Sequence, residues 1–460
     1  MNKNERIAVI GAGPSGITAA KNVIEAGYGD GLTLFEMSDQ VGGNWVFRDE
    51  PSHSSVYETT HIISSKYWSA YEDFPFPEGT PDYPSHRHLL KYFQDYARHF
   101  GVLERTAFNT RVDAAVRQDD GRWALTVTGP EGTRTELFDH LMVSNGHHWN
   151  PRMPELPGEF AGEVMHSHQF KKAAPFAGKR VLVVGGGNSA ADVAVECSRV
   201  AEKVCISMRR GYWFLPKFMM GKPGDVVYHK TEWMPSWLRQ KLLTLSVRLV
   251  QGKNANYGLE EPEYSILQGH PTLNSELMYF IGHGELQPRR GIQAIDGHTV
   301  TFTDGCQDDF DVIICATGYR TTFPFFDKAF IDWEEATQIP LYRKMFHADY
   351  DNLFFIGLFQ PLGCIWPLSD YQAKLAMKAI TGEWKRPANL AEKIAEELRN
   401  PHYDFVAHTK HAVEVDYTRF RRELLDELGS AGSGPYISQV DRSGAAAEPE
   451  TPKYQHRKAA

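Results

Sequence analysis

The chain of 460 residues is long enough for two or three domains, and its 42% hydrophobic and 23% charged residues are typical of globular proteins with a sizeable core. A formal net charge of -9 excludes the basic footprint of a nucleic-acid-binding protein. Five cysteines without a Cys-x-x-Cys pair, no signal-peptide pattern and no apolar stretch of transmembrane length predict a cytoplasmic protein with reduced thiols and no transmembrane anchor.

The N-terminal segment predicts a strand–loop–helix–strand unit. An apolar strand over 7–10 is followed by a glycine-rich loop, a helix over 17–26 and a second strand over 32–35. The loop consists of Gly11, Ala12, Gly13, Pro14, Ser15 and Gly16. Because a helical crossover of this kind joins parallel strands, the sequence predicts an α/β fold.

This loop has the composition of a dinucleotide-binding loop. A pyrophosphate needs backbone N–H groups at a helix start and no side chains in the way. Gly11 makes the tight turn, Gly13 lets the phosphates approach, and Gly16 lets the helix pack on the strand. Glu36, at the end of the second strand, is placed to accept hydrogen bonds from a ribose hydroxyl. The combination predicts a dinucleotide of the FAD kind.

A second unit of the same kind has strands over 180–184 and 203–207 and a helix over 191–200. Its loop consists of Gly185, Gly186, Gly187, Asn188, Ser189 and Ala190. After its second strand, Ser207 is followed by Met208 and then by Arg209 and Arg210, with no acid. Because a guanidinium binds a phosphate bidentately, these arginines favour the 2′-phosphate of NADPH over NADH. Which of the two arginines binds is left open, and the alternative is a solvated basic turn.

The distance between the two units predicts an inserted domain. We expect two Rossmann-type dinucleotide-binding domains, with the nicotinamide domain inserted into a discontinuous FAD domain. A late apolar strand over 311–316 is expected to complete the first sheet. The predicted parts are the FAD domain over 1–155 and 312–440, the latter with C-terminal helices, the NADPH domain over 156–311 with a helical insertion over 212–270, and a disordered tail over 441–460.

The segment 234–250 predicts a basic amphipathic helix, with apolar residues such as Trp237 and Leu245 beside three cations. Such a helix can lie on a membrane surface. The alternative is a helix packed over the domain seam or in a dimer contact, and a homodimer is the commonest assembly.

Several further motifs resemble those of flavin-containing monooxygenases, over about residues 5–400. The signature Phe160-x-Gly162-xxx-His166-xxx-Phe170 stands just before the second glycine loop. Related Baeyer–Villiger enzymes carry Trp at the position of Phe170. Gly42-Gly43-Asn44-Trp45 and Cys315-Ala316-Thr317-Gly318-Tyr319 resemble two other segments of the family.

The resemblance implies an FAD- and NADPH-dependent class B monooxygenase. In this cycle NADPH reduces FAD, the reduced flavin adds dioxygen to form a C4a-(hydro)peroxyflavin, and one oxygen atom passes to an amine nitrogen or a sulfide sulfur of a small molecule. The alternatives are Baeyer–Villiger oxygenation of a ketone and an uncoupled NADPH oxidase. Because the flavin carries the difficult chemistry, no metal is required.

The family motifs also assign residues to the two cofactors. For FAD they are Gly11 to Gly16, Glu36, Gly43, Asn44, Trp45 and Gln360, while Ser64, Thr317 and Gly318 are expected to bind a cofactor without a choice between the two. For NADPH they are Gly185, Gly187, Asn188, Ser189, Ala190, Ala191, Ser207, Arg209 and Arg210. The lone His166 is expected to orient the linker between the domains more than to transfer protons.

One departure from the family pattern concerns catalysis. Many members carry an Asn before the Ser-Ser-Lys segment, where this chain has Ile63. Isoleucine neither donates nor accepts a hydrogen bond, so either Ser64 or His61 substitutes or the peroxide is held differently. The prediction is a shorter-lived intermediate that leaks hydrogen peroxide, with Ile63, Ser64, His61 and Gln360 as the residues around it.

Overall fold

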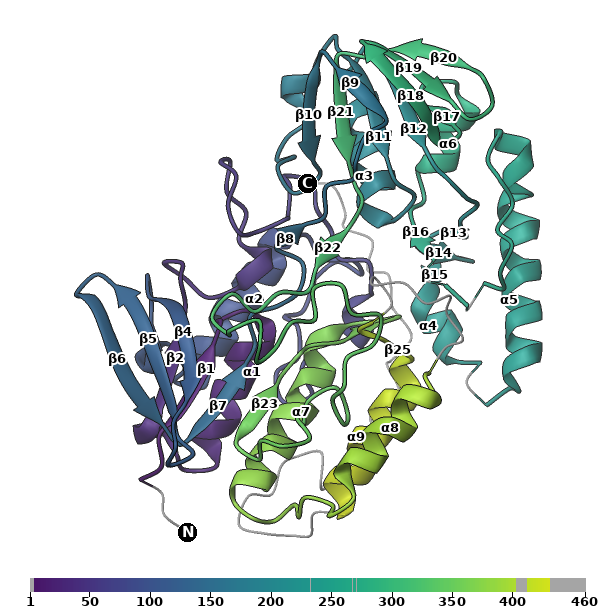
Figure 1. Ribbon diagram of the computed structural model, residues 1–460. Helices are drawn as coiled ribbons and strands as arrows, with labels where there is room; N and C mark the ends of the chain where they lie inside the picture. The colour runs from purple at the N-terminus through teal and green to yellow at the C-terminus, as the bar shows by residue number, and fades with distance from the viewer. Residues whose placement is uncertain (1–3, 232, 267, 270, 403–411, 431–460) are drawn as a thin grey trace, which may run out of the picture.

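The computed structural model describes residues 4–231, 233–266, 268–269, 271–402 and 412–430, and two parallel sheets organise it (Figure 1). The first sheet has the strand order β23-β7-β1-β2-β3. Its strands are β1 (Ile7–Ile10), β2 (Leu32–Phe35), β3 (Thr106–Ala107), β7 (His140–Val143) and β23 (Leu353–Phe355). All of its pairings are parallel, as the N-terminal unit predicts.

Both faces of the first sheet are covered, which explains why β1 is apolar throughout. Ile7 and Val9 face a layer of helices, whereas Ala8 and Ile10 face a core with Trp123. The helices are α1 (Pro14–Glu25), α2 (His86–His99), α7 (Ile365–Ile380), α8 (Leu390–Arg399) and α9 (Tyr417–Ser430). The opposite face carries the antiparallel strands β4 (Arg111–Arg117), β5 (Trp123–Gly129) and β6 (Gly132–Phe138).

The second sheet has the order β10-β21-β11-β12-β17 and is also parallel. Its strands are β10 (Glu163–His166), β11 (Arg180–Val184), β12 (Lys203–Ser207), β17 (Gln287–Arg289) and β21 (Val312–Cys315). Helices α3 (Asn188–Ser198) and α6 (Leu277–Gly282) cover one face. The strands β9 (Gly158–Phe160), β18 (Ile292–Gly297), β19 (Thr299–Phe302) and β20 (Gln307–Asp309) form a separate four-stranded sheet, part of which covers the other face.

The late strand corrects one prediction. The segment 311–316 was expected to complete the first sheet, but β21 pairs with β10 and β11 in the second. The strand that returns to the first sheet is β23, which begins at Leu353, 41 positions after the first residue of β21, Val312. The boundary predicted between 311 and 312 therefore falls inside the second sheet, and two short strands, β8 (Asn150–Pro151) and β22 (Tyr319–Arg320), pair where the chain crosses between the sheets (Figure 1).

Between β12 and β17 the chain forms an inserted segment of short elements. They are β13 (Phe214–Leu215), β14 (Phe218–Met219), β15 (Lys222–Pro223), α4 (Gly224–His229), α5 (Ser236–Gln251) and β16 (Thr272–Leu273). Helix α5 occurs where the amphipathic pattern predicts it, and it stands at the outer edge of the molecule (Figure 1). The predicted tail over 441–460 lies outside the described residues.

No helix in the described ranges combines the length and the apolar character needed to cross a membrane. The remaining strands, β24 (Gln360–Pro361) and β25 (Glu414–Val415), pair in parallel next to α7 and α9 in the chain.

Candidate dinucleotide sites and active site

The first glycine loop leaves no room for side chains at two of its positions. Gly11 has a φ of +95°, and a Cβ there would lie 2.7 Å from the carbonyl oxygen of Ser144. A Cβ on Gly16 would lie 1.7 Å from the carbonyl oxygen of Gly11. Gly13 caps α1 without a side-chain hydrogen bond, so the helix start keeps N–H groups for an anion. This geometry fits a dinucleotide pyrophosphate.

Glu36 joins this loop to the end of β2. Its Oε2 accepts the N–H of Ala12 at 2.7 Å, and its Oε1 accepts the N–H and the hydroxyl of Ser38, both at 2.8 Å. The side chain is buried, so these bonds fix the carboxylate beside the loop. Carboxylate oxygens have further lone pairs, which leaves acceptor capacity for ribose hydroxyls.

The Gly42–Trp45 segment packs directly on the first glycine loop. A Cβ on Gly43 would lie 2.7 Å from Cα of Gly13. Asn44 Oδ1 accepts the N–H of Ser55 at 2.6 Å and its hydroxyl at 3.0 Å. Trp45 meets Trp366 edge to face at 5.9 Å between ring centroids. Three of the predicted FAD residues, Gly43, Asn44 and Trp45, are thus held close to a fourth, Gly13.

The second glycine loop is open at Gly187 and covered by a side chain at Gly186. A Cβ on Gly187 would meet nothing within 4 Å, and α3 begins there without a side-chain cap. A Cβ on Gly186 would lie 2.2 Å from the ring of Tyr212. Asn188 Oδ1 accepts the N–H of Leu273 at 2.7 Å, and Ala190 and Ala191 are buried in the core. The open, uncapped helix start fits a second pyrophosphate.

Two arginines after β12 are available to an anion. Arg209 and Arg210 are exposed, and neither forms an ion pair with a described carboxylate. Arg210 lies 5.6 Å above the ring of Tyr212, which itself covers Gly186. The hydroxyl of Ser207, in contrast, is buried and donates to the carbonyl of Arg290 at 2.6 Å.

The sequence interpretation missed two neighbouring arginines at the end of β17. Arg289 pairs with Asp308 at 2.5 Å, and Arg290 pairs with Glu260 at 3.3 Å. Their proximity to β12 comes from sheet pairing, which no local pattern signals. Because both are engaged, Arg209 and Arg210 remain the better candidates for a 2′-phosphate.

Neither of the two side chains expected to replace the family's Asn at position 63, those of His61 and Ser64, is both buried and free to form a new hydrogen bond. Ile63 is half-buried, whereas His61 is exposed and its Nδ1 lies 2.8 Å from the carbonyl oxygen of Thr59. The buried hydroxyl of Ser64 is hydrogen-bonded to that of Ser69 at 2.9 Å. A group that the sequence did not indicate, Asp225 of α4, accepts the N–H of Ser65 at 2.6 Å.

Gln360 lies on β24 and is held by the C-terminal part of the chain. Its N–H donates to the carbonyl of Val413 at 2.7 Å, and its Oε1 lies 3.4 Å from Nε2 of His147. Burial lowers the pKa of His147 to about 4, although its bond to Gln360 opposes this. The imidazole is therefore neutral at pH 7 and can donate from Nε2 to the amide oxygen.

The Phe160–Phe170 signature begins in β9, includes β10 of the second sheet and ends at a contact with the N-terminal part of the chain. A Cβ on Gly162 would lie 2.4 Å from the carbonyl oxygen of Asp311, and the ring of Phe170 packs 5.6 Å from that of Tyr57. Burial, followed by the charge of His168, lowers the pKa of His166 to about 4. A neutral, buried His166 that accepts the N–H of His168 at 3.0 Å agrees with an orienting role.

The Cys315–Tyr319 segment runs from the end of β21 to the start of β22. The hydroxyl of Thr317 donates to the carbonyl of Arg152 at 2.5 Å, and Gly318 has a φ of +89°. The N–H of Arg152 donates back to Gly318 at 2.9 Å.

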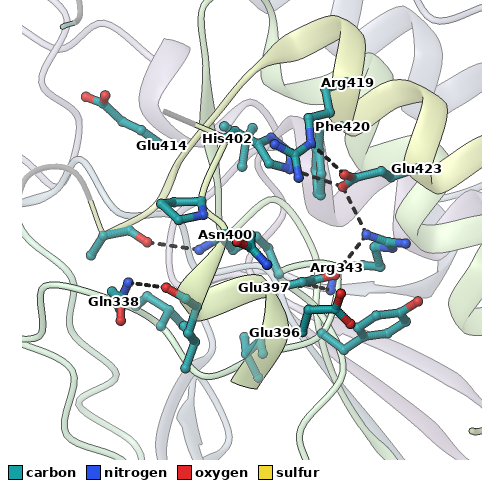
Figure 2. A pocket seen from close by; sticks show the side chains of 18 of the residues that line it. Gln338, Arg343, Glu396, Glu397, Asn400, His402, Glu414, Arg419, Phe420 and Glu423 are labelled. Atoms are coloured by element: carbon teal, nitrogen blue, oxygen red, sulfur yellow. Dashed lines mark hydrogen bonds and ion pairs between the residues drawn. The ribbon is translucent and has the colours of Figure 1, made fainter. Parts of the chain in front are cut away.

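A cavity of about 560 Å³ lies elsewhere, among the segment 337–344, α8 and α9 (Figure 2). Arg343 is one of the residues that line it and pairs with Glu397 at 2.8 Å, Glu423 at 3.0 Å and Glu427 at 3.5 Å. None of the predicted cofactor-binding residues is among the described residues that line this cavity. Its charges serve the packing of the C-terminal helices.

Comparison with known proteins agrees with this geometry. The model of a family described as flavin-binding monooxygenase-like matches residues 4–443. The rabbit (Oryctolagus cuniculus) dimethylaniline monooxygenase [N-oxide-forming] 2 is 33% identical over 449 residues, which cover 93% of this chain and 83% of the relative. Human flavin-containing monooxygenase 5 is 33% identical over 448 residues, with 92% and 83% covered.

Solved structures share the fold at lower identity. S-allyl-L-cysteine S-oxygenase from Allium sativum has a TM-score of 0.69 at 22% identity, covering 95% of this chain and 90% of that one. Cyclohexanone monooxygenase from Rhodococcus sp. Phi1, bound to NADP+, has a TM-score of 0.69 at 15% identity, with 93% and 98% covered. With a family match over nearly its whole length and two glycine loops at helix starts, the chain belongs to the flavin-binding monooxygenase-like family.

Proposed function

We propose that this protein is an FAD- and NADPH-dependent monooxygenase that transfers one atom of dioxygen to the nitrogen of an amine or the sulfur of a sulfide. The observation that carries the proposal is the pair of unlike dinucleotide loops. One is followed by a buried Glu36, and the other by two arginines that pair with no described carboxylate. Overall, substrate, dioxygen, NADPH and a proton give oxygenated product, water and NADP+.

The chain's own residues bind, orient and exclude water. Bound FAD would supply the redox chemistry and NADPH the electrons. Glu36 and the start of α1 hold one dinucleotide, and the start of α3 with Arg209 and Arg210 holds the other. Neutral His147 holds the amide of Gln360, which would lie near the flavin of a bound FAD.

Ile63 sets how well oxygenation is coupled to NADPH oxidation. Its side chain offers no hydrogen bond, Ser64 is engaged with Ser69, and His61 is exposed. We therefore expect part of the NADPH to be oxidised with release of hydrogen peroxide. Ile63→Asn, which restores a donor and an acceptor, is expected to lower the peroxide yield per NADPH.

A substrate panel tests this function. The FAD-loaded protein is incubated with NADPH or NADH and with a tertiary amine, a thioether or a cyclic ketone, while hydrogen peroxide is measured. An N-oxide or sulfoxide, formed faster with NADPH, supports the proposal. An ester from the ketone alone would replace it with the Baeyer–Villiger alternative, and peroxide without any product would replace it with an NADPH oxidase.

The exposed face of α5 supports a proposal about a second kind of partner, a membrane surface. Six apolar residues are exposed there or just before the helix: Trp233, Trp237, Leu242, Leu245, Leu249 and Val250. The helix has three cations and no acid, and Arg248 pairs with Glu261, which leaves Arg239 and Lys241 without a described carboxylate partner. A second copy would bring these two like charges together, whereas an anionic lipid surface would attract them. We propose that this face contacts anionic membrane surfaces.

Vesicle co-sedimentation tests that contact. Binding to phosphatidylserine-containing vesicles, lost in the double variant Leu245→Glu with Leu249→Glu, supports it. Equal recovery with both proteins contradicts it, and a change of oligomeric state in the variant would favour a homodimer instead. The homodimer and the cytoplasmic location stay predictions.

A further inference from the structure

A strap of chain over residues 52–58 connects the two dinucleotide sites. In its middle, Ser55 donates its N–H and hydroxyl to Oδ1 of Asn44, which follows Gly43, the residue that packs against Gly13 of the first glycine loop. The buried ammonium of Lys171 donates to the carbonyl of Ser54 at 2.6 Å, and the N–H of Glu58 donates to the carbonyl of Lys171 at 2.9 Å. The strap is thus hydrogen-bonded both to the Gly42–Trp45 segment beside the first glycine loop and to Lys171, which follows the Phe160–Phe170 signature.

Tyr57, a residue of the strap, packs into the core of the nicotinamide domain. Its ring is buried in the cluster formed by residues of β11 and α3, such as Val183 and Ala190. Its hydroxyl donates to Oδ2 of Asp192 at 2.7 Å. A residue of the first domain therefore takes part in the packing of the helix that begins at the second glycine loop.

Asp192 is the point where three parts of the chain meet. It lies on α3, one turn after Asn188, the first residue of that helix. Its Oδ1 accepts the side-chain N–H of Asn274 at 2.6 Å, from the end of the inserted segment. In the same segment Thr272 donates its hydroxyl to the carbonyl of Gly186 at 2.7 Å. One carboxylate thus ties strap, helix start and inserted segment together.

The environment of Asp192 makes these two bonds strong. Burial raises the pKa of Asp192, and the charge of Lys217 with the bonds from Tyr57 and Asn274 opposes that shift. Asp192 forms no ion pair within the part of the chain that the structure describes, so neutral donors satisfy it. Because a desolvated carboxylate loses a great deal when a donor is removed, each bond constrains the junction.

We propose that Tyr57 and Asp192 are positioning residues for NADPH, which hold the second glycine loop in register with the FAD loop. This inference rests on the function proposed above. Hydride transfer between a bound nicotinamide and a bound flavin would need the reacting atoms about 3–3.5 Å apart, and a shift of about 1 Å can cost about a hundredfold in rate. A loosened junction therefore weakens nicotinamide binding and slows flavin reduction.

Three variants and a matched control test the role. Tyr57→Phe removes only the hydroxyl, Asp192→Ala removes both bonds, and Asp192→Asn keeps the shape with part of the hydrogen bonding. Tyr342→Phe is the control, because its hydroxyl also bonds a carboxylate, Glu427, but within the FAD domain alone. The measurements are FAD content, NADP+ dissociation constant, the NADP+-induced rise in melting temperature, and KM for NADPH against kcat.

Tyr57→Phe is expected to raise the NADP+ dissociation constant about tenfold, as loss of one hydrogen bond to a buried carboxyl group predicts, with normal FAD content. Asp192→Ala should exceed it, and Asp192→Asn should lie closer to the unsubstituted protein. If Tyr57→Phe and Asp192→Ala match Tyr342→Phe in NADP+ affinity, the junction is only structural and the inference is overturned.

Failure of the proposed function gives a different result. If the unsubstituted protein oxygenates nothing in the substrate panel, the monooxygenase proposal fails. A weaker NADP+ affinity in Tyr57→Phe would still support the positioning role, because that measurement needs no oxygenation.

Discussion

Arg209 and Arg210 offer the sharpest test of the second dinucleotide site. If they bind the 2′-phosphate, replacing either with alanine removes a charge-assisted bond that only NADPH makes. Hydrogen bonds to charged groups contribute about 1.5–3 kcal/mol, and both side chains are exposed, so the lower end applies. That value corresponds to about a tenfold rise in KM for NADPH.

The assay is steady-state NADPH and NADH oxidation by the FAD-loaded protein. KM for NADH should change little, because NADH lacks the phosphate, so the preference for NADPH should fall about tenfold for the variant that binds it. Arg290→Ala is the matched control, since Arg290 lies nearby but is paired with Glu260. Loss of the preference in Arg290→Ala alone, or an equal rise in both KM values, would refute the assignment.

Four further outcomes follow from the geometry. Gly16→Ala should abolish FAD retention, because its Cβ would lie 1.7 Å from a backbone oxygen. Gly187→Ala should keep the melting temperature and the FAD content but weaken NADP+ binding, because its Cβ would stand where the phosphates are expected. Normal NADP+ affinity of Gly187→Ala would contradict that placement of the phosphates. Arg343→Ala should lower the free energy of unfolding by about 1.5–3 kcal/mol in a urea titration, because three carboxylates lose a half-buried, charged hydrogen-bond partner, although Glu423 keeps His402 and Arg419. A loss below about 1 kcal/mol would show that the network is not needed. Burial acts to raise the pKa of Glu423, but His402 and then Arg343 outweigh it and lower the pKa to about 2. This group therefore stabilises the fold above the unfolded carboxyl pKa of about 4.3, and the stability is lost as pH falls toward 2; Glu423→Gln should flatten the pH dependence of unfolding in that range, and an unchanged slope would contradict it.

The sequence predicted what depends on neighbouring residues. Both glycine loops, their helices and the amphipathic helix α5 are encoded by local spacing, and the structure has them there, although α1 begins at Pro14 and α3 at Asn188, each three residues before the predicted start. The order Gly11 to Gly16 specifies a turn and a close helix–strand contact within a few residues. Such features need no knowledge of distant partners.

Strand β21, which was expected in the first sheet, shows that local patterns predict a strand but not the sheet to which it belongs. The run 312–315 is fully buried and apolar, as a strand of either parallel sheet would be. Its pairing with β10 and β11 is decided by the path of the chain between the sheets, which periodicity does not encode.

Asp192 and Asp225 were missed for a related reason. A single aspartate on a helix looks like an exposed polar residue, and the partner of Asp192, Tyr57, is 135 positions away. Asp225 likewise meets Ser65 only because the inserted segment folds back on the first domain. Only the assembled structure shows that these carboxylates are held at the junctions of the domains.

The measurement that most directly tests the central claim follows the oxygen atom. The FAD-loaded protein is incubated with NADPH, a thioether and ¹⁸O-labelled dioxygen, and the sulfoxide is analysed by mass spectrometry. The account predicts one labelled oxygen atom in each product molecule, with NADPH consumed at least in equal amount. Unlabelled sulfoxide, or a protein that retains FAD and oxidises NADPH without oxygenating any amine or sulfide, would contradict it.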